Sequence, residues 1–114
     1  MAVVDLAQLL AELQRDLGLS DEELTQALGV SPLTLRRWRA GASYPQTGAR
    51  KELERLAHLR DELRDLFGEA EATSAWMHSK NRYLGGFTPA EALRVGHLDR
   101  VEGALEALSL GLFV

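Results

Sequence analysis

Apolar residues recur every three or four positions along most of this 114-residue chain, which is the spacing of one face of an α-helix. In residues 4–17 this face carries five leucines, and Gly18 follows as a helix stop. Similar patterns predict further helices over 21–28, 32–39, 48–67, 70–77, 89–95 and from 98 onward. No stretch of useful length alternates apolar and polar residues as a strand does. The sequence therefore predicts an all-α fold of about seven helices.

Residues 19–41, LSDEELTQALGVSPLTLRRWRAG, have the pattern of two short helices joined by a tight corner. Ser20 and Glu23 have the spacing of a capping box at the start of the first helix. Gly29 provides the corner, where a positive φ costs a glycine little, and Ser31 caps the next helix. This arrangement is typical of a helix-turn-helix.

The second of these helices has one apolar edge, and its other sides are polar or small. Leu35 and Trp38, three positions apart, are expected to face the core. In a helix-turn-helix the second helix enters the major groove of DNA, so its remaining residues are the candidate DNA contacts. These candidates are Ser31, Pro32, Leu33, Thr34, Arg36, Arg37 and Arg39.

The long helix predicted after residue 47 carries leucines at positions 56, 59, 63 and 66. We expect Thr47 as its N-cap and Gly68 as its stop. The spacing of 3, 4 and 3 is the a/d pattern of a helix that faces another helix. Two heptads are too few for a coiled coil, so a core-facing helix is favoured over a dimer zipper. Pairs four positions apart, such as Arg50 and Glu54, explain its mixed charges.

Composition narrows the class of protein. The chain has no cysteine, which excludes a disulfide framework, a thiolate metal site and a cysteine nucleophile. No apolar run approaches the roughly 20 residues of a membrane span. The N-terminal residues lack the basic flank and cleavage pattern of a signal peptide. We therefore expect a cytoplasmic protein with no membrane segment.

The net charge of −4 hides an uneven distribution. Residues 1–30 contain six acids and one base, and residues 61–114 contain nine acids and five bases. Residues 31–60, in contrast, contain seven bases and two acids. The one basic block thus begins at the candidate recognition helix, where local potential can steer association with phosphates. The basic residues from Arg50 onward are explained equally well by contact with phosphates and by an ordinary solvated helix face.

No catalytic or metal-binding pattern is present in the sequence. The three histidines, His58, His78 and His97, lie 20 and 19 positions apart and match no ligand spacing. The pair Gly85-Gly86 belongs to no phosphate-binding loop, and no serine has the context of a nucleophile elbow. We therefore expect neither an enzyme nor a cofactor.

The second half of the chain carries a more specific motif. Trp76 is followed by NRYLGGFTPAEAL at residues 81–93, and then by Gly96 and Val101. This run resembles the toxin-binding domain of the Xre/MbcA/ParS family. Upstream, GVSPLTLRRWRAGASYP resembles the Xre-type helix-turn-helix normally fused to that domain. The terminal GLFV is similar to the end of mycobacterial antitoxins of this family, so the resemblance covers about residues 19–114.

The resemblance implies a type II antitoxin encoded beside a toxin of the RES-domain family. Such toxins are similar to ADP-ribosyl transferases and destroy NAD⁺ by hydrolysis or phosphorolysis. In the family, the antitoxin's C-terminal region packs over the toxin's NAD⁺ pocket, and the complex represses its own promoter. The resemblance also implies a DNA-binding region over 1–67, a toxin-binding domain over 68–114, a homodimer and a larger toxin–antitoxin complex.

An apolar chain end is difficult to bury within its own domain and usually marks a partner site. The candidate toxin contacts are Trp76, Asn81, Arg100, Leu110, Gly111, Leu112, Phe113 and Val114. Several structural alternatives remain open. The tail can instead fold back on Trp76 and Leu84, Trp76 can be part of the scaffold, and Asn81 can be a turn residue. Arg82, Arg94 and Arg100 can reach an acidic toxin surface or remain solvated.

One position departs from the family pattern. Xre-type domains usually have a glutamine, able to touch phosphate, where this chain has Asp21. An acid there suits the helix dipole but repels DNA phosphates, which predicts modest DNA binding by a single copy. Two alternative functions follow. One is a stand-alone repressor whose C-terminal half only dimerises, and the other is an adaptor that has lost DNA binding.

Overall fold

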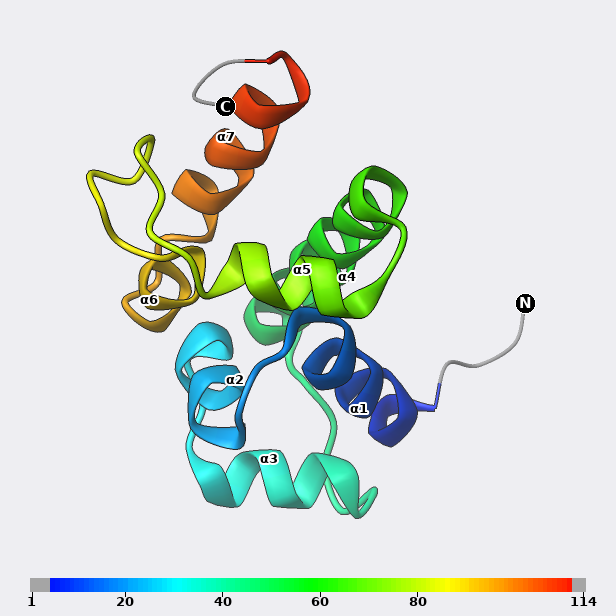
Figure 1. Cartoon of the computed structure of the whole chain (residues 1–114). Helices are drawn as coiled ribbons and strands as arrows, with labels where there is room; N and C mark the ends of the chain where they lie inside the picture. The colour runs from blue at the N-terminus through cyan, green and yellow to red at the C-terminus, as the bar shows by residue number, and fades with distance from the viewer. Residues whose placement is uncertain (1–4, 112–114) are drawn as a thin grey trace.

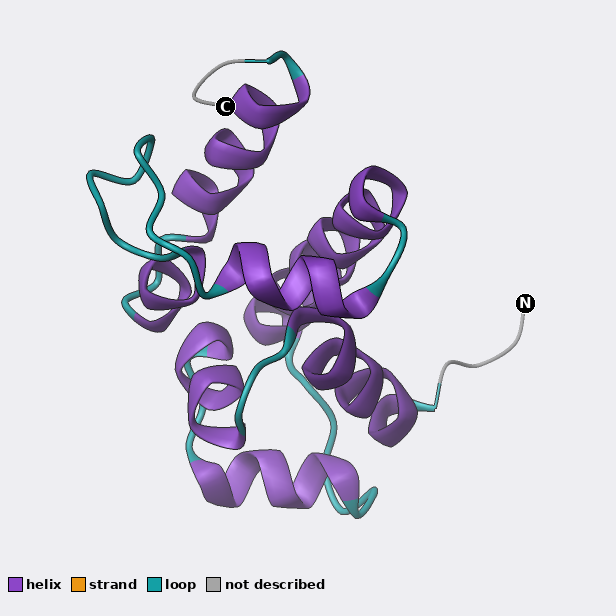
Figure 2. Ribbon diagram, in the orientation of Figure 1, coloured by secondary structure: helices purple, strands orange, loops and turns teal. Residues whose placement is uncertain are grey.

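The computed structural model describes residues 5–111, and seven helices joined by turns and loops account for that part of the chain (Figures 1 and 2). The all-α prediction is therefore confirmed. The helices are α1 (Leu6–Leu17), α2 (Asp21–Leu28), α3 (Pro32–Arg39), α4 (Thr47–Phe67), α5 (Ala70–Met77), α6 (Pro89–Arg94) and α7 (Leu98–Ser109).

Local capping explains why several helices begin where they do. At α2 the Glu23 backbone N–H donates to Ser20 Oγ, and the Ser20 N–H donates to Glu23 Oε1, at 3.0 and 2.9 Å. Thr88 and Glu91 form the same reciprocal capping box at α6, at 3.0 and 2.9 Å. Each box satisfies two backbone donors that a helix N-terminus leaves without intrahelical partners.

A single hydrophobic core runs through both halves of the described chain. Leu10, Leu13, Leu59 and Leu63 are fully buried between α1 and α4, and Met77 of α5 is fully buried in the same cluster. Figure 1 shows α5 lying across α1 and α4, with α3 at one end of the molecule and α7 at the other. The apolar faces predicted for the helices therefore pack together in one hydrophobic core.

Two expectations about α4 were wrong. The N-cap is Gln46, which makes no side-chain capping bond, and Thr47 is already the first helical residue. Leu66 is 44% exposed, although the a/d pattern placed it on the buried face. In the last turn Phe67 faces inward instead, since it lies four positions after Leu63 and contacts Trp76 with ring centroids 6.4 Å apart. The helical period of 3.6 residues permits either position to continue the face.

Asp16 of α1 is a buried charge at the junction with α4. Its carboxylate accepts hydrogen bonds from Arg15 Nε at 3.0 Å and from Arg64 Nη2 at 2.7 Å. Arg60 Nη1 lies 3.6 Å from the same carboxylate. Burial raises the pKa of Asp16, but the bonds from Arg15 and Arg64 outweigh it and leave the pKa below its usual value. The pair Arg50–Glu54, in contrast, is not among the ion pairs of residues 5–111.

None of the helices described is both long enough and apolar enough to span a lipid bilayer.

Candidate functional site

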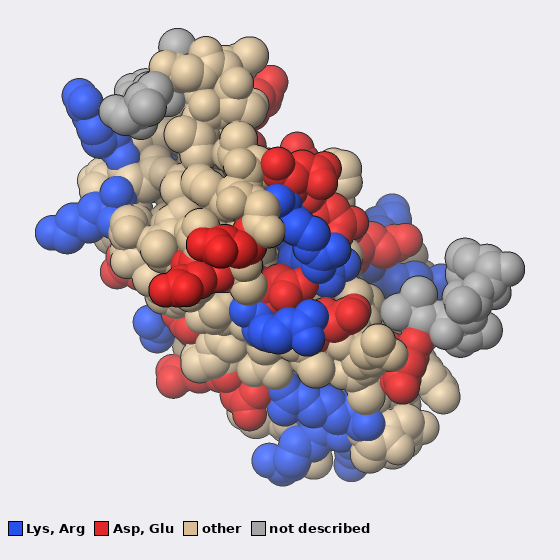
Figure 3. Space-filling model, turned by 45° about the vertical axis from the view of Figure 1, so that its right-hand side comes forward, with Lys and Arg blue, Asp and Glu red and all other residues tan. Residues whose placement is uncertain are grey.

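The outer surface of α3 presents most of the predicted DNA contacts. Leu35 and Trp38 are buried against the core, as expected, with 2% and 4% of their surface exposed. The side chains of Arg36 and Arg37 are exposed, unlike those of Leu35 and Trp38 on the buried side of the helix. Ser31, Pro32 and Leu33 are also exposed, and Thr34 is half-buried. Figure 3 shows basic side chains gathered at the lower end of the molecule, where α3 lies.

The N-terminus of α3 is fixed by its own residues. Ser31 Oγ accepts a hydrogen bond from the Thr34 backbone N–H at 3.1 Å and donates to Thr34 Oγ1 at 3.0 Å. Pro32 occupies the first helical turn, where a missing N–H costs nothing. The rigid start of α3 leaves the arginines as the long, adjustable side chains of this surface.

Arg39 differs from the other two arginines because it already has protein partners. Its guanidinium donates to Asp21 Oδ1 at 2.9 Å and to the side-chain oxygen of Gln14. The hydrogen bond from Arg39, followed by one from Gln14, holds the pKa of Asp21 below its usual value. Asp21 is therefore paired with a cation of α3, and the Nη2 atom of Arg39 is already engaged.

In the C-terminal half, two predicted toxin contacts lie within the scaffold. Trp76 is half-buried and packs on Phe67 of α4. Asn81 closes the loop between α5 and α6 through its backbone: its N–H donates to the Phe87 carbonyl at 3.0 Å, and its carbonyl accepts from Gly86 at 2.9 Å. Gly85 and Gly86 both have positive φ in this loop, which explains the glycine pair.

The other predicted toxin contacts that the structure describes lie in α7 or directly after it. Arg100 is exposed in the first turn of α7, and Leu110 is 68% exposed directly after its last turn. Gly111 is exposed with φ of 78°. Leu112, Phe113 and Val114 lie outside the described residues. The predicted residues thus occupy separate places: Trp76 and Asn81 near α5, Arg100 at the start of α7, and Leu110 at its end.

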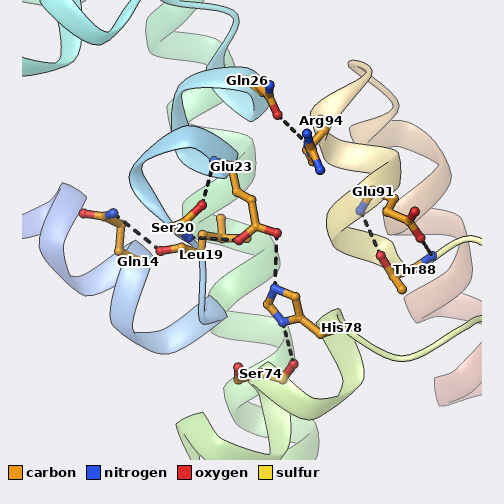
Figure 4. A network of polar contacts seen from close by, with 10 residues as sticks. All are labelled: Gln14, Leu19, Ser20, Glu23, Gln26, Ser74, His78, Thr88, Glu91 and Arg94. Atoms are coloured by element: carbon orange, nitrogen blue, oxygen red, sulfur yellow. Dashed lines mark hydrogen bonds and ion pairs between the residues drawn. The ribbon is translucent and has the colours of Figure 1, made fainter.

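Polar contacts that the sequence did not predict join α2 to the C-terminal half (Figure 4). Glu23 uses one carboxylate oxygen in its capping box, while the other lies 3.3 Å from His78 Nε2. Arg94 Nε donates to Gln26 Oε1 at 2.6 Å. The partners are 55 and 68 positions apart, so no local sequence pattern could reveal them. These contacts link α2, which also packs on α3, to the end of α5 and to α6.

Within residues 5–111 there is no group of three or more His, Asp or Glu side chains arranged to hold a metal ion.

Comparisons with known proteins match both halves of the chain. Residues 6–61 match the antitoxin Xre-like helix-turn-helix domain, and residues 62–111 match the antitoxin Xre/MbcA/ParS C-terminal toxin-binding domain. The mycobacterial cidal antitoxin MbcA of Mycobacterium tuberculosis strain H37Rv is 36% identical over 98 residues, which are 86% of each chain. The chain belongs to the Xre/MbcA/ParS family of antitoxins.

Further comparisons agree with this assignment to the antitoxin family. A probable mycobacterial cidal antitoxin of the same strain is 29% identical, over 85% of this chain and 82% of its own. The crystal structure of the M. tuberculosis MbcT–MbcA toxin–antitoxin complex contains a chain with a TM-score of 0.69 and 33% identity, covering 98% of this chain and 100% of its own. An antitoxin is not an enzyme, in agreement with the sequence analysis. The two family matches meet inside the uninterrupted α4.

Proposed function

We propose that this antitoxin binds a RES-domain toxin encoded beside it and covers the toxin's NAD⁺ pocket with its C-terminal region. Support comes from the toxin-binding domain over residues 62–111 and from the MbcA chain found in complex with MbcT. The observation that carries the proposal for the C-terminal region is the exposure of Leu110, 68%, at the end of α7. A large apolar side chain that is exposed to solvent is available to a partner.

Co-expression tests this function directly. The toxin gene adjacent to the antitoxin gene is induced with the full chain, or with a chain lacking Leu110 to Val114. We expect the full chain to restore growth and preserve cellular NAD⁺, and the shortened chain to do neither. A chain lacking residues 2–4, another apolar terminal segment, is the matched control and should neutralise fully. Equal neutralisation by the chain without Leu110 to Val114 would show that the tail has no part in inhibition.

We also propose that α3 brings the protein to its own promoter, where it represses transcription as a homodimer or as part of a larger toxin complex. The exposed Arg36 and Arg37 on a helix-turn-helix support this. Arg36→Ala and Arg37→Ala each remove a side chain able to read a base, and each should weaken binding to the promoter fragment by about 1–3 kcal/mol. Gel shifts with and without toxin, over a range of salt concentrations, provide the measurement.

The stand-alone repressor is the second candidate function, and the same basic surface of α3 favours it. It predicts full promoter binding without toxin and no protection of NAD⁺ in the co-expression experiment. Several copies acting together would raise the affinity of a modest binding unit, so an antitoxin is expected to bind the promoter more tightly within the toxin complex.

A further inference from the structure

A hollow of about 520 Å³ lies between α2, α6, the start of α7 and the loop that precedes α6. Leu84, Phe87 and Val95 form its apolar lining, and Arg94 and Arg100 stand among its polar residues. None of the apolar three was a candidate site residue in the sequence analysis. Most of the hollow lies on the stretch that matches the toxin-binding domain.

Two of the three large apolar side chains that line the hollow are mostly exposed to solvent. Phe87 is 62% exposed and Val95 is 69% exposed. Phe87 stands directly before the N-cap Thr88, a position whose side chain normally packs on the fourth helical residue as a hydrophobic staple. That fourth residue is Ala92, which is too small to cover a phenyl ring. Capping therefore does not account for the exposed ring.

The segments that carry these side chains are fixed rather than loose. Phe87 accepts the Asn81 N–H through its carbonyl at 3.0 Å, which closes the loop, and the capping box of Thr88 follows at once. Val95 is the C-cap of α6, and Gly96 turns the chain away with φ of 82°. Both side chains are thus presented in a set geometry, which lowers the entropy lost when a partner binds.

The charges around the hollow favour an acidic partner. Glu91 is engaged in its capping box, where the hydrogen bonds from Thr88 hold its pKa below the usual value. Arg94 is shared between Gln26 at 2.6 Å and Glu22 at 3.8 Å. Arg100 forms no ion pair within residues 5–111. Figure 4 shows Arg94 reaching from α6 to Gln26 of α2, and both residues line the hollow.

We infer that this hollow anchors the toxin. It accommodates an apolar side chain of the toxin, and a carboxylate next to that side chain in the toxin pairs with Arg100. The inference rests on the proposed function and assigns toxin binding and toxin inhibition to two different parts of the C-terminal region. The hollow provides affinity, and the tail beyond α7 provides inhibition.

Two observations favour the toxin as the occupant. All but one of the residues lining the hollow come from the 62–111 stretch that matches the toxin-binding domain, and the exception is Gln26. That match ends at residue 111, so the stretch that matches the toxin-binding domain includes Phe87, Val95 and Arg100 but not the last three residues. The part of α7 that follows Arg100 separates the hollow from the tail by about 14 Å, and one partner of standard interface size can span both.

The test compares binding with inhibition for the full chain and its variants, using the purified toxin encoded next to the antitoxin gene. We expect Phe87→Ala and Arg100→Glu each to weaken toxin binding at least about ten-fold, with growth rescue lost when antitoxin expression is low. Leu66→Ala removes another exposed leucine of the same domain and should bind as the unaltered chain does. Far-UV circular dichroism checks that each variant is folded.

The chain lacking Leu110 to Val114 completes the test. We expect it to bind the toxin within about three-fold of the full chain while leaving NAD⁺ breakdown uninhibited. Unchanged toxin affinity in both Phe87→Ala and Arg100→Glu would overturn the anchoring surface and leave the proposed function standing. No binding of the toxin by the full chain would overturn the proposed function itself. Loss of all binding with the tail would also overturn the anchoring role of the hollow.

Discussion

At the scale of single residues, Asp16 shows how a buried charge joins two helices. Its carboxylate lies between Arg15 of its own helix and Arg64 of α4, with only 12% of the side chain exposed. Asp16→Asn should lower the free energy of unfolding at pH 7 by about 1–3 kcal/mol, because it leaves buried hydrogen-bonding groups poorly matched. Urea unfolding measures the loss, and the exposed Asp65→Asn on α4 should change stability little.

The same carboxylate should make stability depend on pH in the acid range. Its pKa in the folded chain is below the usual value of 3.8. The stabilisation is therefore complete above about pH 4 and is lost as the pH falls through the folded-state pKa. In Asp16→Asn this part of the acid destabilisation should be missing. An identical decline below pH 4 in both proteins would show that Asp16 is not responsible.

A second residue-scale expectation concerns the pair between Arg39 and Asp21. Arg39→Ala should weaken promoter binding less than Arg36→Ala, because the positive charge of Arg39 is already paired with Asp21. Asp21→Asn should strengthen promoter binding and steepen its salt dependence by about one unit, since it frees a cation for phosphate. Glu71→Gln on α5 removes an exposed acid from the C-terminal half and should leave binding unchanged. Weaker binding by Asp21→Asn would contradict the role of the pair.

At the scale of helices, α1 and α5 approach each other so closely that only glycine fits between them. A Cβ on Gly18, where φ is +66°, would lie 2.0 Å from Ser74 Oγ and 2.7 Å from Ser74 Cβ. Gly29 has nearly the same φ, +68°, but nothing within 4 Å of an added Cβ. Gly29→Ala should therefore cost about 1–2 kcal/mol from backbone strain, and Gly18→Ala a further 1–3 kcal/mol from overpacking.

Thermal or urea unfolding of the two alanine variants separates strain from packing. The difference between them measures the contact between α1 and α5 alone, because the backbone angle is matched. Equal losses of stability would mean that Ser74 moves aside without cost.

The helices also show which features of the fold follow from sequence. The starts of α2, α3 and α6 were predictable because their caps are made by residues three positions apart. The buried edge of Leu35 and Trp38 followed from spacing alone. Leu66 was placed wrongly because Trp76 packs on Phe67 in the last turn of α4 and leaves Leu66 exposed, and no pattern within α4 contains that information. Local capping sets the starts of these three helices, whereas distant partners decide which face is buried.

The candidate sites divide in the same way. The exposure of Arg36, Arg37 and Leu110 could be predicted from the sequence, since it follows from the apolar and polar pattern of a continuous segment. Phe87 and Val95 could not, because they lie outside any helical face and become neighbours only when the loop folds over α6 and α7. Their one sequence signal is a large apolar residue beside a glycine at each end of the helix at 89–94.

At the scale of the whole molecule, the shared core predicts that both halves unfold together. Trp38 lies in the N-terminal half and Trp76 in the C-terminal half, so each reports on one half. In Trp76→Phe and Trp38→Phe, the fluorescence of the remaining tryptophan should change at the same urea concentration as the far-UV circular dichroism. Coincident transitions are the sign of a single cooperative unit. Separate midpoints within either variant would show two independently stable domains.

The close packing of Gly18 against Ser74 has a consequence for how such antitoxins diversify. A crossover between two genes that joins the start of one antitoxin to the end of another brings together an α1 and an α5 that have not been selected as a pair. Any side chain larger than hydrogen at position 18 collides with this α5. A recombinant antitoxin with a side chain at position 18 is therefore expected to be less stable, so the two halves are exchanged most readily between antitoxins that share this contact.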